Sequence, residues 1–477
     1  MRSALESKAL SGGVALVARQ MVGIALSIAS MLISTRLLGP HKYGHYAIIT
    51  GLMGYATVVG KMGLDVYLIR RQGDLYQDHI GVTQCLYSFI GIVIVSVGLL
   101  LGPLAAKWYG EPDLRGLLWA YAVVPPMTLM SGVPIALLDR RLEYKKSVKV
   151  ELSGQVVYVA VSLLIVVLTR TVWGLVLGAI CQAAVSLIMA VRLSGMKFRP
   201  SWDAIEAKAQ LRYGLGYASS GWIWQMRNLV NPVIVGKMLG AEAVAYVAMA
   251  IRLATLVGFA KLAIWRVYMS FLARLSDDRE KMRKAIESGL SLQVLVLGVS
   301  FIGFLVLAPE IVRGLMGAKW MPILVVFPFI AAGMMVNGGF SLHSSALYVT
   351  GYNWDVSRFH VAHILMFAAG AVFFIHAAGS ITGYGLAEVA AFASYRWIRN
   401  GLRRRLFTIN ESRLYMNIAI GIAGMALMSG IQGSALWVRM LTGLAFLLAM
   451  TFGIPTNRAA SLGVLGEMTT RFSLKNA

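Results

Sequence analysis

The chain has 477 residues, of which 58% are hydrophobic and only 14% charged, and its mean hydropathy is +0.70. Soluble domains average about 25% charged residues, so this composition excludes a water-soluble globule. The 44 Lys and Arg outnumber the 21 Asp and Glu, and the resulting net charge of +23 must lie where water or anionic lipid reaches it. Cys85 and Cys181 lie in apolar runs and predict neither a disulfide framework nor a Cys-rich metal site.

Long apolar runs recur along the whole chain. A helix needs about 20 apolar residues to cross the hydrocarbon of a membrane. The runs of about this length are 14–37, 44–69, 80–101, 114–138, 150–168, 172–191, 213–239, 243–267, 290–307, 323–349, 361–378, 381–398, 414–431 and 435–454. The first run is too long for the core of a cleavable signal. The sequence therefore predicts an all-α membrane protein of about 14 transmembrane helices.

Basic residues gather in alternate loops. The loops at 140–149, 192–212, 274–284 and 399–405 carry most of the Lys and Arg, and the intervening turns hold few. Since Lys and Arg are retained on the cytoplasmic side during insertion, both termini are predicted to be cytoplasmic. The basic loops are expected to contact membrane lipids, and because they lack interleaved aromatics no nucleic-acid partner is expected. No loop could hold a soluble catalytic domain, which argues against an enzyme.

One short motif occurs twice. Residues 36–47 and 237–248 both contain a basic residue, an apolar pair closed by Leu-Gly, a tight turn and an aromatic-plus-Ala entry into the next helix. Gly39 and Gly240 are an even number of predicted helices apart. This spacing implies two six-helix halves related by a pseudo-two-fold axis along the membrane normal, as in transporters that work by alternating access.

The repeat predicts three domains. They are an N-terminal six-helix bundle at 1–200, a C-terminal six-helix bundle at 201–405, and a C-terminal helix pair with a cytoplasmic tail at 406–477. The second bundle is expected to be preceded by a short amphipathic helix at 202–212 on the inner membrane surface.

Several charged residues fall inside predicted spans, where a charge is costly unless it faces water or a partner. Four are cations from the first two helices of each half: Arg19, Lys61, Arg227 and Arg252. They predict a shared aqueous cavity that attracts an anionic cargo, and the planar fork of Arg suits phosphate. Lys61 and Asp65 are four residues apart, so an ion pair on one helix face is the alternative for them.

Glu388 is an isolated acid within the predicted helix 381–398. Glu388 and Asp65 are candidates for binding the H⁺ or Na⁺ that drives transport, and an internal salt bridge is the alternative for Glu388. Lys261 and Arg266 lie close enough to the inner end of their helix to extend into water.

No cofactor is predicted. His360 and His363 are three residues apart but lack the further ligands that a metal site needs. No Gly-rich phosphate loop follows a strand. The sequence thus predicts neither a metal site nor an internal ATPase.

The chain resembles the Wzx-like lipopolysaccharide and exopolysaccharide exporters, the polysaccharide transporters of the multidrug/oligosaccharidyl-lipid/polysaccharide flippase superfamily. The segments that carry the resemblance are 36–44, 63–70, 138–144, 227–228, 236–242, 275–279, 309–320 and 379–383. The resemblance implies flipping of a polyprenyl-pyrophosphate-linked oligosaccharide across a bacterial inner membrane, with polysaccharide polymerase and export proteins as partners. Such proteins often carry Asp where this chain has Asn231, which weakens an ion-coupling role for that helix.

Two other functions remain open. A cation-coupled multidrug-type exporter of the same fold should carry acidic rather than basic residues deep in its cavity. A membrane-bound polysaccharide polymerase or glycosyltransferase would need a larger outside loop than 102–113.

Overall fold

The computed structural model describes residues 2–73, 75–275 and 278–453, with side chains from residue 21 onward except at 220, 263, 266 and 270. Every regular element within these residues is a helix, which confirms the all-α prediction for the part of the chain described. The contacts divide the chain into two units, Met1–Ala245 and Tyr246–Ala477.

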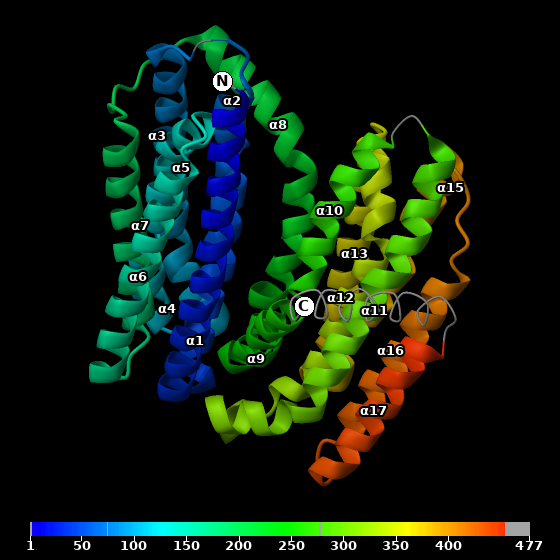
Figure 1. Ribbon diagram of the computed structural model, residues 1–477. Helices are drawn as coiled ribbons and strands as arrows, with labels where there is room; N and C mark the ends of the chain where they lie inside the picture. The colour runs from blue at the N-terminus through cyan, green and yellow to red at the C-terminus, as the bar shows by residue number, and fades with distance from the viewer. Residues whose placement is uncertain (1, 74, 276–277, 454–477) are drawn as a thin grey trace, which may run out of the picture. The chain divides into compact units, whose positions relative to one another are not determined.

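The first unit is a bundle in which α6 packs along α7 and α1, and α3 packs along α5 (Figure 1). Its helices are α1 (Arg2–Lys61), α2 (Leu64–Arg70), α3 (Gln77–Tyr109), α4 (Asp113–Tyr121), α5 (Val124–Arg140), α6 (Tyr144–Thr169), α7 (Trp173–Ser194), α8 (Ala204–Met226), η1 (Arg227–Leu229), η2 (Val230–Val235) and the start of α9 (Gly236–Val257). Helix α8, where the sequence places the start of the second bundle, packs on α1, α2 and α3 of the first unit.

The second unit is built around α12, which is the most buried of the candidate membrane helices. Its helices are the rest of α9, α10 (Ala260–Arg274), α11 (Arg279–Ile311), η3 (Val312–Met316), η4 (Ala318–Trp320), α12 (Ile323–Val349), α13 (Asn353–Ala378), α14 (Thr382–Ala390), η5 (Ala391–Ser394), α15 (Tyr395–Arg405), α16 (Ser412–Gly430) and α17 (Leu436–Phe452). Helices α10, α11, α14 and α16 pack around α12.

Nine helices in the described part of the chain are long and apolar enough to cross a membrane. The longest stretch, Met21–Arg70, has 50 residues, more than twice the number, about 20, that one crossing of the hydrocarbon needs. Leucines on the outer helix faces are exposed, for example Leu100 at 70%, Leu168 at 73% and Leu365 at 64%. Such apolar faces are unfavourable in contact with water, but lipid tails cover them in a membrane. The chain is therefore a multi-pass membrane protein.

Both copies of the repeated motif form the same turn. Gly39 (φ 71°, ψ 174°) interrupts α1, and Gly240 (φ 83°, ψ 178°) interrupts α9. A side chain is strained at such a positive φ, so glycine is the residue that fits both kinks. Figure 1 shows α1 running away from the N-terminus and α2 lying back beside it, so the chain reverses at Gly39. Gly44, just after the first turn, packs against the backbone of Ala241, just after the second.

Two predicted spans are interrupted. The sequence predicts one helix at 114–138, but α4 ends at Tyr121 and α5 begins at Val124. Pro125 and Pro126 have no N–H to bond to the preceding turn, so the break falls before them. The span predicted at 381–398 is likewise divided into α14, η5 and α15.

Candidate functional site

The start of α8 is fixed to the first unit by a capped end and an ion pair. The Asp203 carboxylate accepts hydrogen bonds from the backbone N–H groups of Ile205 (2.8 Å) and Glu206 (3.2 Å). Arg71 Nη1 donates to both carboxylate oxygens of Glu206, at 2.8 Å each. Burial alone raises the pKa of Glu206, but hydrogen bonds from Gln210 and Arg71 lower it below its ordinary value. Glu206 is therefore ionised and neutralises Arg71.

One face of the early α8 turns is buried against α3. Gln210 is fully buried, and its side chain accepts a hydrogen bond from Thr83 Oγ1 (2.9 Å) and donates to the His79 carbonyl (3.0 Å). Trp202 and Ile205, on the stretch predicted to be amphipathic, are exposed. Residues 204–212 are continuous with the rest of α8, and their position on the membrane surface stays a prediction.

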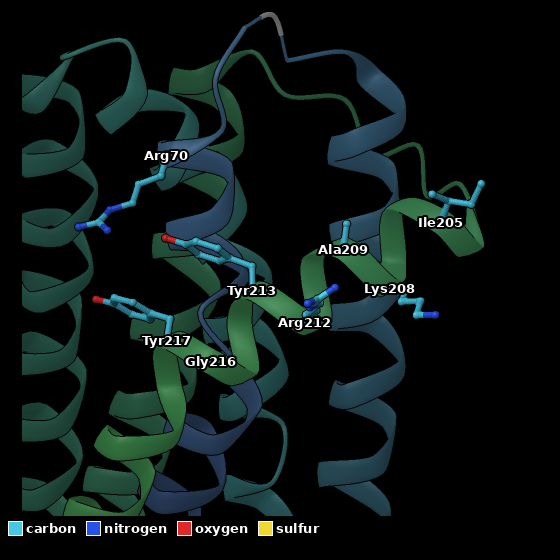
Figure 2. A pocket seen from close by; sticks show the side chains of 8 residues that line it. All are labelled: Arg70, Ile205, Lys208, Ala209, Arg212, Tyr213, Gly216 and Tyr217. Carbon is cyan, nitrogen blue, oxygen red and sulfur yellow. The ribbon is translucent and has the colours of Figure 1, made fainter. Parts of the chain in front are cut away.

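A pocket of about 780 Å³ opens along the exposed side of α8. It is lined by Arg70, Ile205, Lys208, Ala209, Arg212, Tyr213, Gly216 and Tyr217 (Figure 2). Its three cations form no ion pair with any other residue that the structure describes, and no carboxylate is among the lining residues. An uncompensated group of three positive charges attracts an anion.

The aromatic wall of this pocket consists of two parallel rings. The Tyr213 and Tyr217 rings are stacked, with their centroids 6.4 Å apart and 4° between their planes. The Tyr67 ring meets Tyr213 edge-on at 5.5 Å. Figure 2 shows both hydroxyl ends of the stacked pair pointing to the side on which Arg70 lies. Guanidinium groups beside aromatic rings suit a ligand with an anionic group and an apolar or flat face.

The helix is broken between Lys61 and Asp65. Lys61 is the last residue of α1, and Met62 and Gly63 both have positive φ. Because of this break, Lys61 and Asp65 do not lie on the same face of one helix. Their side chains form no ion pair with each other. The structural pairing considered for them is therefore wrong. Asp65 instead accepts a hydrogen bond from the Val66 N–H (2.9 Å) at the start of α2.

The broken segment lies against the cationic pocket. A β-carbon on Gly63 would lie 3.0 Å from the Tyr217 ring, so the break packs on the aromatic wall of the pocket, and Lys61, which is exposed, precedes Gly63 by two residues. Arg227 lies ten residues beyond Tyr217 in the chain, or about 15 Å of helix. Arg227 is half-buried, and its guanidinium carbon is 6.0 Å from the Trp224 ring centroid.

Helical geometry changes at Arg227, the first residue after α8. The α-helix ends, and a 3-10 turn and a π-helix follow. Pro232 lies in the π-helix, where its missing N–H loosens the ordinary hydrogen-bond ladder. Asn231 is buried, and its Nδ2 donates to the Val244 carbonyl (3.2 Å). Asn231 thus holds the π-helix to α9.

The other two predicted cations are not placed with these. The side chain of Arg19 lies outside the described residues. Arg252 is exposed on the part of α9 that belongs to the second unit. A cavity shared by all four cations stays a prediction.

The second unit holds two polar groups at its centre. Glu388 on α14 is buried, and a β-carbon on Gly333 of α12 would lie 3.0 Å from its carboxylate. Lys261 Nζ donates to Asn337 Oδ1, and Asn337 Nδ2 donates to the Tyr395 hydroxyl (3.0 Å). Lys261 is half-buried, and α12 offers its ammonium group an amide oxygen as a partner. The Arg266 side chain lies outside the described residues.

The cationic pocket was not predicted from the sequence, although one signal was present. Lys208 and Arg212 are four residues apart at the start of a helix, as are Tyr213 and Tyr217. Arg70 comes from a segment far away in the chain, and only packing of α8 on α2 brings it to the same surface.

Comparisons with known proteins place the chain in a family. A family model described as polysaccharide biosynthesis protein matches residues 33–325. The lipopolysaccharide biosynthesis protein WzxC of Escherichia coli (strain K12) is 23% identical over 391 residues, which cover 79% of this chain and 77% of that protein. The succinoglycan biosynthesis transport protein ExoT of Rhizobium meliloti (strain 1021) is 23% identical over 303 residues, or 62% of this chain and 60% of that protein.

Solved structures of transporters share the fold. The lipid II flippase MurJ in an inward closed conformation has a TM-score of 0.71 at 13% identity, and the match covers 92% of this chain and 98% of that one. An inward-facing MATE family multidrug resistance transporter of the MOP superfamily has a TM-score of 0.65 at 16% identity, over 83% of this chain and 99% of that one. The activities named among these proteins are transport and lipid flipping. Since the family model matches more than half its length, the chain belongs to the polysaccharide biosynthesis protein family, as one of its Wzx-like membrane members.

Proposed function

We propose that this protein flips an oligosaccharide linked to polyprenyl pyrophosphate across the bacterial inner membrane by alternating access. Membership of the family, similarity to WzxC and ExoT, and the fold shared with the lipid II flippase MurJ support this proposal. The cargo is a repeat unit of an exopolysaccharide or lipopolysaccharide, and a polymerase and export proteins act on it afterwards.

The observation that carries the proposal is the cationic pocket along α8. Arg70, Lys208 and Arg212 together supply three positive charges without a facing carboxylate. A pyrophosphate is the part of the cargo with the highest charge density, and guanidinium groups bind phosphate oxygens in pairs. The stacked rings of Tyr213 and Tyr217 offer a flat face to a sugar or to the first isoprene units.

The deeper cations extend the path of the anion in this proposal. Lys61 lies two residues before Gly63, which packs on Tyr217, and Arg227 follows directly after the end of α8. Arg19 and Arg252 complete a cavity in which the pyrophosphate stays paired with positive charge while the prenyl tail remains in lipid. Without such partners the charge would face hydrocarbon at high cost.

The proposed topology has about 14 transmembrane helices and cytoplasmic termini. The identical turns at Gly39 and Gly240 support two six-helix halves with a pseudo-two-fold axis along the membrane normal, followed by the α16 and α17 pair. In this topology the two repeated bundles comprise residues 1–200 and 201–405. The final segment comprises residues 406–477. Asp65 or Glu388 binds the H⁺ or Na⁺ that drives the cycle.

A cation-coupled multidrug-type exporter is the second candidate. The fold shared with a MATE family transporter favours it. The charge of the pocket disfavours it, since three unpaired cations repel a cationic drug. A substrate test therefore separates the two functions.

Complementation of a deletion strain tests the proposal. We expect R70A/K208A/R212A, R227A and R252A to abolish surface polysaccharide and to accumulate lipid-linked oligosaccharide at the inner leaflet, with normal protein levels in the membrane. The matched control is R192A/K197A/R199A, which removes three exposed cations of the same unit that lie outside the pocket. Polysaccharide export at normal levels in the pocket variant would remove the pocket from the mechanism. Normal export by every variant, together with altered drug resistance, would favour the multidrug exporter.

A further inference from the structure

Two histidines and a glutamate meet in the first unit, away from the cationic pocket. His41 and His45 are one helical turn apart in α1, directly after the kink at Gly39. Glu111 lies in the turn between α3 and α4. His41 Nε2 is 2.9 Å from Glu111 Oε1, and His45 Nε2 is 3.3 Å from Glu111 Oε2. The two imidazole centroids are 4.9 Å apart.

His45 is left with an unsatisfied atom. Its side chain is 4% exposed, and its Nε2 is buried without a hydrogen-bond partner among the described residues. The 3.3 Å approach to Glu111 does not have the geometry of a hydrogen bond. A buried nitrogen without a partner is destabilising, so this atom points to a ligand. The half-exposed ring of His41 leaves a path from solvent to the cluster.

The three side chains offer the donor set and spacing of a zinc site. Zn²⁺ binds imidazole nitrogen and carboxylate oxygen at about 2.0–2.2 Å in a tetrahedron, which places neighbouring ligand atoms about 3.4 Å apart. The ligand atoms of His41, His45 and Glu111 all lie within 4.8 Å of one another. Two nitrogens among three donors disfavour Mg²⁺ and Ca²⁺, which prefer oxygen.

We propose that His41, His45 and Glu111 bind Zn²⁺, with water in the fourth coordination position. The metal joins the kink of α1 to the α3–α4 turn and satisfies His45 Nε2. Its role is structural, because it fixes the end of the unit at which the repeated turns pack on each other through Gly44 and Ala241. The proposal does not depend on what the protein transports.

Zinc binding to the purified full-length protein tests this site. After treatment with a chelator, the protein is dialysed against Zn²⁺ alone, and bound metal is measured per chain. We expect about one Zn²⁺ per chain, a raised midpoint of thermal unfolding, and no such shift with Mg²⁺. Substituted Co²⁺ should give the intense visible absorption of a tetrahedral site.

The variants H41Q and E111Q decide the assignment, since His45 is buried and its replacement can disturb folding. Each should weaken Zn²⁺ binding at least about tenfold, the scale on which even indirect metal partners act. H376Q, which removes an exposed histidine of the second unit, is the control and should bind like the unaltered protein. If the unaltered protein binds no Zn²⁺, or if H41Q and E111Q bind it unchanged, the proposal fails and the cluster is a histidine–carboxylate ion pair.

Discussion

Gly44 and Ala241 are in backbone contact, and this contact joins the two copies of the repeated turn. A β-carbon on Gly44 has no room, because it would overlap the carbonyl of Ala241. The two residues are almost 200 positions apart in the chain, yet each lies just after a glycine with the same unusual backbone angles. Packing at the turns is therefore a tertiary feature that the repeat makes possible.

Gly44→Ala should destabilise the protein by about 1–3 kcal/mol, the usual cost of overpacking, because the neighbouring atom is backbone and cannot rotate away. Gly54→Ala is the matched control, since Gly54 lies in the same helix with nothing near its missing β-carbon. Ala there should be neutral or stabilising. Thermal unfolding of the two variants in the same detergent measures the difference. Equal midpoints would mean that the turns do not pack as described.

A buried arginine in the second unit predicts an asymmetric mutational effect. Arg439 on α17 is 3% exposed and donates to the Val306 carbonyl (3.0 Å) and to Glu310 Oε2 (3.0 Å). Glu310→Ala leaves this buried cation without its carboxylate, which should cost about 1–3 kcal/mol. Arg439→Met should cost less, because the half-exposed Glu310 is then hydrated. Unfolding in denaturant compares the two, and a larger loss for R439M would contradict the assignment.

The ion pair that fixes α8 predicts a dependence on pH. The pKa of Glu206 is lowered in the folded protein despite burial, through Gln210, Arg71 and Tyr67. A lowered pKa adds stability above the ordinary value of about 4.3, and this stability is lost as the pH falls through the folded value. We expect the temperature of the unfolding midpoint to decrease as the pH falls below about 4.3. The contribution of Glu206 to this decrease should be absent in E206Q. E143Q, at a half-exposed pair with Lys146, should keep the full pH dependence.

Ion coupling can be assigned with two isosteric variants. Glu388 is buried against Gly333, so a proton or Na⁺ that binds there changes the charge at the centre of the second unit. Glu388→Gln should abolish export driven by an ion gradient and leave membrane insertion unchanged. Asp65→Asn is compared in the same vesicle assay, because Asp65 is the other candidate. Gradient-driven export by both variants at normal rates would exclude both residues from coupling.

The sequence by itself determined the class of the protein and most of its helices. Crossing hydrocarbon is a local requirement on each segment, met by length and hydropathy alone. For this reason the run predicted at 323–349 coincides with α12, and the Leu-Gly motif identified both turns. Local patterns also contain the signal of a proline break, as at Pro125.

The tertiary structure alone decided which distant side chains share a surface. Arg70 joins Lys208 and Arg212 because α8 packs on α2. The break at Met62 and Gly63 separates Lys61 from Asp65, which spacing had placed on one face. Such features depend on which helices touch, and the hydropathy of a helix does not specify its neighbours. The physical reason is that lipid tails solvate the apolar face of any helix about as well as another helix does. Close packing and polar pairing therefore determine which helices become neighbours.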